Sequence, residues 1–199
     1  MKPTSKLMKC LSLYLFLILF TLQTPSQADD IRDFQIEGMS IGDSLLDHFS
    51  EEEIKASTLN YYNDNKFTPV EFEFLPIFKT YDAVEYNYKT DGKKYIIHSI
   101  AGLIDFPNNI KDCYKKKDEI VKELKKVFIN TTSFDKKNEE HIDKSIKGKI
   151  TSTYFDLEFG DRASVQCYDW NKETNYIDHL RIGIRTKEFK EFLLNKAYK

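Results

Sequence analysis

The expected fold class follows from residues 67–106, which read FTPVEFEFLPIFKTYDAVEYNYKTDGKKYIIHSIAGLIDF. Apolar and polar side chains alternate over residues 67–75 and again over residues 84–88, which is the two-residue period of a half-buried strand. Asp91-Gly92 has the composition of a hairpin turn, and residues 94–106 return as a longer strand. This stretch therefore predicts three sequential antiparallel strands.

The sequence also predicts helices before and after these strands. Apolar side chains recur every three or four positions over residues 110–128, which predicts a long helix with lysines and glutamates on its solvent side. Ser50 and Glu53 match a capping box that opens a short helix, and a closing helix is expected from about Lys187. Pro69 cannot donate a hydrogen bond to a sheet, so the first strand is expected either to lie at an edge or to begin after Pro69.

The second half repeats the alternation. Strands are expected around residues 155–159, 163–170 and 180–184, and residues 130–148 are expected to form a charged connection. The sequence therefore predicts an α+β domain, with about six strands in two three-stranded antiparallel meanders and helices packed on one face of the sheet.

Residues 1–28 have the pattern of a cleaved signal peptide. Three lysines precede an apolar run from Cys10 to Leu22, and Ser26-Gln27-Ala28 supplies small residues at a cleavage site. The run is about 13 residues, shorter than the ~20 that a membrane-spanning helix needs. We expect a periplasmic or secreted protein with a single domain at residues 29–199, and no transmembrane segment after cleavage.

The net charge is −2 for the whole chain. Loss of the three lysines in residues 1–28 reduces 30 basic residues to 27 against 32 acidic ones, a net charge of −5. A mildly acidic surface argues against general binding of nucleic acid.

Two cysteines remain in the expected mature chain. Cys113 lies on the apolar stripe of the long helix and Cys167 on the inward row of a predicted strand, so both sulfurs point into one helix–sheet interface. The two cysteines are 54 residues apart (167 − 113). In an oxidising compartment, a disulfide between them would add about 4 kcal/mol to the free energy of unfolding by the loop-entropy estimate. The alternative is two separate buried thiols.

Gly42-Asp43-Ser44-Leu45 spells GDSL and resembles the motif of the GDSL esterases and lipases, in which this serine is the nucleophile. The resemblance implies that role for Ser44 alone. Asp178 and His179 are adjacent rather than spaced as D-x-x-H, and neighbouring strand residues point to opposite faces. An overlapping G-x-S-x-G match at residues 38–42 is explained by a turn that needs two glycines.

Four residues form a candidate binding patch. Tyr168 and Trp170 share the strand face opposite Cys167, and Arg181 and Arg185 lie on the corresponding face of the next strand. This patch is either exposed or covered by the 130–148 segment or a helix. The four histidines show no metal-ligand spacing, so no metal or cofactor is expected.

As a whole the chain resembles a family of small exported proteins from marine alphaproteobacteria whose function is unassigned. The stretches that carry the resemblance are DFQIEGMSIGDSLLDHFSEEEIK (33–55), DCYKKKDEIVKEL (112–124), VQCYDW (165–170) and YIDHLRIGIRTKEF (176–189). The resemblance implies an envelope location and a helix–strand cysteine pair.

Residues 36–49 are also similar to the start of small periplasmic BamE- and BLIP-like modules, which bind other proteins. We therefore expect a ligand-binding or protein-binding module, with another envelope protein as a candidate partner, rather than an enzyme. The alternative is a divergent GDSL-type serine esterase or lipase that uses Ser44.

Overall fold

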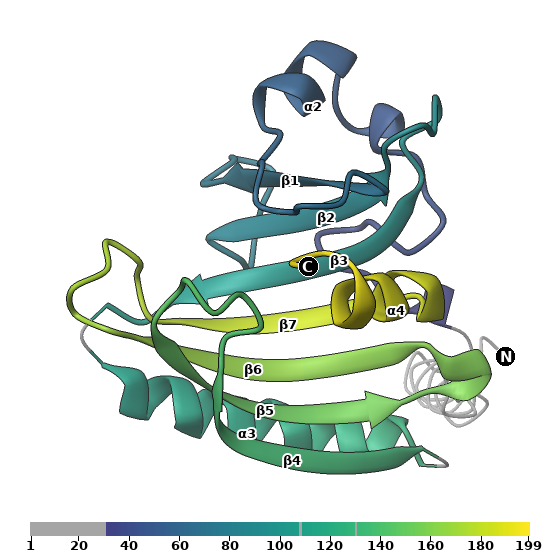
Figure 1. Cartoon of the computed structure of the whole chain (residues 1–199). Coiled ribbons are helices and arrows are strands. Elements are labelled where there is room, and N and C mark those ends of the chain that lie inside the picture. The colour runs from purple at the N-terminus through teal and green to yellow at the C-terminus, as the bar shows by residue number, and fades with distance from the viewer. Residues whose placement is uncertain (1–30, 108, 130) are drawn as a thin grey trace, which may run out of the picture.

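The computed structural model describes residues 31–107, 109–129 and 131–199. This part of the chain forms one seven-stranded antiparallel sheet with three α-helices (Figure 1). The strands are β1 (Phe67–Glu73), β2 (Ala83–Lys89), β3 (Ile97–Asp105), β4 (Thr132–Glu140), β5 (Gly148–Asp156), β6 (Arg162–Trp170) and β7 (His179–Arg185). The helices are α2 (Glu51–Ala56), α3 (Ile110–Val127) and α4 (Lys187–Asn195). The strand order across the sheet is β1-β2-β3-β7-β6-β5-β4.

The first three strands form the expected meander. β1 lies at one edge of the sheet, which is one of the two arrangements expected from Pro69, and pairs with β2 on its inner side only. Part of its outer side is covered, because Leu59 N donates to Pro69 O at 2.9 Å and Glu71 N donates to Ser57 O at 3.1 Å. This edge of the sheet is therefore partly closed by the chain that precedes it.

The expected number of strands was wrong. The segment from residue 130 to 148, expected to be a connection, contains β4, which pairs with β5 and forms the other edge of the sheet. The second meander therefore has four strands, and the sheet has seven. β4 reads TSFDKKNEE and has no buried residue, so it lacks the apolar alternation by which a strand is recognised. Lysines on an exposed edge strand oppose pairing with other chains.

The long helix packs on one face of the sheet. α3 crosses behind the strands and contacts β6 and β7, as Figure 1 shows. Val165 and Cys167 of β6 and Leu180 of β7 belong to the core beneath it. Residues 31–56 extend this apolar layer over β1 and β2, where the rings of Phe49 and Phe72 stack at 4.0 Å. The burial of these side chains is the main source of stability for this layer.

The expectation that all helices pack on one face was also wrong. α4 lies on the face opposite α3 (Figure 1). Its Phe189 and Phe192 form a second apolar cluster with Phe67 of β1 and Ala197. Phe67 points away from α3 because strand side chains alternate, so it provides an apolar site for a helix on the second face.

The predicted signal peptide, residues 1–28, lies outside the described residues. Within the part that the structure describes, no helix is both long and apolar enough to cross a membrane.

Candidate functional site

The sheet face opposite α3, which we call the polar face, buries an unusual set of hydrophilic side chains. Its buried polar members are Glu85, Asn87, Ser99, Ser152, Ser164 and Gln166. They alternate along their strands with the apolar residues of the α3 side, and the strand register places them in neighbouring rows. A buried polar side chain is more informative about a site than an exposed apolar one, because burying it without a partner costs free energy.

An ion pair crosses this face. Arg181 Nη2 lies 2.7 Å from Glu85 Oε1, and Nη1 lies 3.1 Å from Oε2. Burial by itself raises the pKa of Glu85, but the Arg181 guanidinium outweighs burial and holds that pKa below its ordinary value. Ala101 of β3 and Gly183 of β7 lie opposite each other in the strand register. A Cβ on Gly183 would lie 3.0 Å from the Ala101 Cβ. Small residues therefore keep this part of the face low enough for Arg181 to lie across it.

The second arginine of β7 has a different environment. Arg185 Nη2 donates to Ser164 Oγ at 3.0 Å and approaches Gln166 Oε1 at 3.4 Å. Its Nε is shielded from solvent and has no hydrogen-bond partner among the described residues. Burial lowers the pKa of the Arg185 guanidinium from its ordinary value.

Aromatic side chains form one end of the polar face. The rings of Tyr168 and His179 stack at 4.7 Å, and Trp170 packs against Tyr168 at 5.3 Å. His141, from the end of the β4 region, packs against Trp170 at 5.7 Å and against Tyr168 at 6.4 Å. Burial lowers the pKa of His179 to about 4, so this imidazole is neutral at neutral pH.

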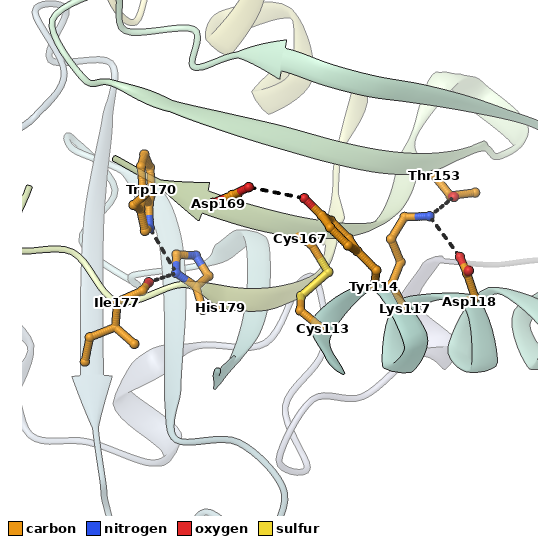
Figure 2. Close-up of a disulfide and its surroundings, with 10 residues drawn as sticks. All are labelled: Cys113, Tyr114, Lys117, Asp118, Thr153, Cys167, Asp169, Trp170, Ile177 and His179. Carbon is orange, nitrogen blue, oxygen red and sulfur yellow. Dashed lines mark hydrogen bonds and ion pairs between the residues drawn. A yellow bond between two sulfur atoms is a disulfide. The ribbon is translucent and has the colours of Figure 1, made fainter. Parts of the chain in front are cut away.

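The stacked cluster has hydrogen bonds at its outer side. His179 Nδ1 lies 2.9 Å from Ile177 O and 3.4 Å from Trp170 Nε1, as Figure 2 shows. The shorter contact requires a proton on Nδ1, because a carbonyl oxygen only accepts. A protonated Nδ1 cannot accept the indole N–H of Trp170, so this N–H remains able to donate elsewhere.

A hollow of about 470 Å³ opens beside this cluster. Trp170 and His141 form part of its wall, and Gly148 lies against the Trp170 ring, where a Cβ would approach Cε3 to 2.6 Å. The charged residues at its rim are Glu140, Lys144, Lys147, Lys149 and Asp169. The hollow is within the size range of small-molecule sites.

The GDSL serine does not line the hollow, and its hydroxyl is occupied by structural contacts. Ser44 Oγ donates to Lys94 O at 2.7 Å and accepts from Leu46 N at 3.2 Å. Its hydrogen-bond partners in the described part of the chain are all backbone groups, whereas a serine nucleophile needs an adjacent general base. The nearby glycines Gly38 and Gly42 both have positive φ, at 81° and 95°, as the turn explanation of the overlapping motif requires.

The predicted disulfide between Cys113 and Cys167 is present, on the α3 side of the sheet. Figure 2 shows it between α3 and β6, and the next turn of the helix carries Lys117. Lys117 Nζ donates to Thr153 Oγ1 at 2.8 Å, and Thr153 donates to Asp135 Oδ1 at 2.6 Å. The disulfide thus belongs to the packing of the helix and lies on the opposite face from the aromatic cluster.

The four residues of the predicted patch lie on one face but do not form one exposed surface. Trp170 borders the hollow, Tyr168 is stacked between rings, and Arg181 is held by Glu85. Each of the four is only partly accessible to solvent.

Sequence reasoning missed Glu85 and His141. Glu85 falls on the polar side of the alternation in residues 84–88, which is typical of an exposed position, and only the structure shows that β2 is buried along almost its whole length. His141 had no signal either in the charged segment around it. Within the described residues, no group of three or more His, Cys, Asp or Glu side chains could hold a metal ion.

Comparison with protein-family models, with curated proteins and with solved structures finds no match to this chain.

Proposed function

We propose that this protein is an exported binding module of the cell envelope that takes a small polar ligand in the hollow beside Trp170. The observation that carries the proposal is the hollow itself, with an indole and an imidazole in its wall and charged side chains at its rim. Aromatic walls supply contact area, and a few polar groups orient a ligand. The indole N–H, with only a long contact to His179, supplies one such group.

Export is supported by two features of different kinds. The N-terminal pattern is that of a signal peptide, and the Cys113–Cys167 disulfide is typical of proteins that fold in oxidising compartments. The intact mass of protein recovered from the cell envelope tests export. We expect a chain that begins at Asp29, whereas a full-length cytoplasmic chain with all three cysteines as free thiols would contradict it.

The sequence offers a direct probe of the hollow, because Trp170 is the only tryptophan of the chain. Emission excited at the indole band therefore reports the wall of the hollow. We would titrate the protein with monosaccharides, amino acids and small dicarboxylates, each as a separate series. The proposal predicts a saturable change of emission with at least one class.

Matched variants connect that signal to the hollow. Lys149→Glu reverses a charge at the rim and should weaken the binding of the responding class at least tenfold. Lys93→Glu makes the same charge change at an exposed position in the β2–β3 connection and should leave it unaltered. Absence of a response to all three classes, or equal responses in both variants, would overturn a ligand site at Trp170. If no small molecule changes the emission but an envelope protein binds saturably, the result would favour a protein-binding function instead.

A further inference from the structure

Arg185 is a cation that pairs with no carboxylate in the described part of the chain. Three arginines lie close together on the polar face, and two of them have carboxylate partners. Arg181 pairs with Glu85 at 2.7 Å, and Arg162 Nε lies 2.7 Å from Asp156 Oδ1. No ion pair of Arg185 occurs among the residues that the structure describes, so this cluster carries one excess positive charge.

The neighbours of Arg185 are neutral groups that can turn hydrogen-bond donors toward an anion. Ser164 Oγ accepts from Arg185 Nη2, and its own hydrogen reaches Gln166 Oε1 only at 3.3 Å. Gln166 Nε2 donates to Ser152 Oγ at 3.1 Å and to the Tyr154 hydroxyl at 3.3 Å. The Tyr154 hydroxyl has only a long 3.5 Å contact with Glu139, so its hydrogen is not firmly held.

The shielded Nε–H is the second observation. A buried donor without a partner costs free energy, and an uncompensated charge costs more. Arg181, four residues earlier on the same strand, shows that this sheet supplies a carboxylate where a structural arginine is buried. Arg185 instead has a serine, a glutamine and a shielded Nε–H without a partner among the described residues.

We propose that Arg185, with the hydroxyls of Ser164 and Tyr154, binds the carboxylate of a small organic monoanion. The single excess charge matches a carboxylate rather than a doubly charged phosphate. The guanidinium and a carboxylate have matching planar, two-point geometry. The hydroxyl groups of Tyr154 and Tyr168 lie close enough to Arg185 to interact with it electrostatically. The site is separate from the hollow at Trp170, because neither Arg185 nor its hydrogen-bonding neighbours line that hollow.

The test follows the Arg185 Nε–H signal by NMR in ¹⁵N-labelled protein during titration with benzoate and acetate. Benzoate should shift this signal saturably and slow its exchange with water, and acetate should do the same at higher concentration. Inorganic phosphate, titrated at equal ionic strength, should bind at least tenfold more weakly than benzoate. Tighter binding of phosphate would replace the carboxylate assignment, and no movement with any of the three anions would overturn the site.

Variants provide the control. Arg185→Gln should weaken benzoate binding at least tenfold by calorimetry, and Arg185→Lys should weaken it less, because it keeps the charge but loses the two-point geometry. Lys190→Gln removes a cation of α4 that is held by Gly160 O and should leave binding unchanged. Equal affinities in Arg185→Gln and the wild type would overturn the proposal. The wild-type NMR titration remains a full test if Arg185→Gln fails to fold, and neither experiment depends on the Trp170 signal.

Discussion

Arg181 of β7 reaches across β3 to Glu85 of β2, a carboxylate 96 residues earlier in the chain, and joins it through two hydrogen bonds of 2.7 and 3.1 Å. The pair spans the junction between the two meanders, whose strands are joined by the pairing of β3 with β7. It therefore connects the polar halves of the sheet on the face that carries the candidate sites.

Removing one partner of this pair should be strongly destabilising. We expect Glu85→Gln and Arg181→Met each to lower the free energy of unfolding by about 3 kcal/mol, because each leaves a buried group without its counter-charge. The double variant should lose clearly less than the sum, as measured by urea unfolding. Lys55→Gln, which breaks an exposed pair with Glu51, should cost no more than about 0.5 kcal/mol. Additive losses in the double variant would show that the two side chains are not coupled.

The Cys113–Cys167 disulfide should be a major contribution to stability. It closes a separation of 54 residues, so replacing both cysteines with alanine should cost about 4 kcal/mol by the loop-entropy estimate. Guanidinium unfolding measures the cost. In the wild-type protein, alkylation without prior reduction should add no mass at these two residues. Two alkylated thiols in unreduced exported protein would contradict the bond.

Ser44 should behave as a structural serine. A fluorophosphonate probe is expected to leave the protein unlabelled, since the hydroxyl is bonded to Lys94 O and the Leu46 N–H rather than to a base. Ser44→Ala should lower the free energy of unfolding by about 1 kcal/mol through loss of the cap. Labelling of the wild type that disappears in Ser44→Ala would instead establish the esterase alternative.

Glu71 should make stability depend on pH. It lies opposite Glu85 in the β1–β2 register, and burial, with the Glu85 charge as a second cause, raises the pKa of Glu71 from 4.5 to about 7. Between these values the folded protein keeps a proton that the unfolded chain has lost. Its contribution to the free energy of unfolding therefore decreases as the pH rises from 4.5 to 7.

The variant Glu71→Gln isolates this effect. Relative to the wild type, it should gain roughly 1–3 kcal/mol at pH 8 and little at pH 4, as measured by urea unfolding at each pH. Taking the difference between the two proteins removes the opposite contribution of His179, whose lowered pKa makes stability increase with pH between about 4 and 6.5. A difference that is the same at pH 4 and pH 8 would refute the raised pKa.

Local patterns predicted most of the elements correctly. The capping box at Ser50 begins α2, and the apolar stripe over residues 110–128 is α3 almost to the residue. The same stripe placed Cys113 against the sheet, and the alternation in β6 turned Cys167 toward it. These predictions succeeded because each depends on a motif or a period within one element.

The failures concern features that no single element contains. β4 has polar side chains on both faces because it is an exposed edge strand, so its sequence resembles a loop. α4 has an apolar stripe, but a stripe does not specify which face of the sheet receives it. The aromatic cluster could not be predicted either, because His141 contacts Trp170 only when β4 and β5 are paired.

The sequence by itself therefore determined the α+β class, the identity of most elements, the side of each strand that faces the core and the cysteine pair, because residue periods are set by local backbone geometry. Only the tertiary structure decided that β7 pairs with β3, that Glu85 meets Arg181, and that Arg185 has no carboxylate partner among the described residues. These outcomes depend on how strands distant in the chain align side by side, and strand periodicity contains no information about that choice of neighbour.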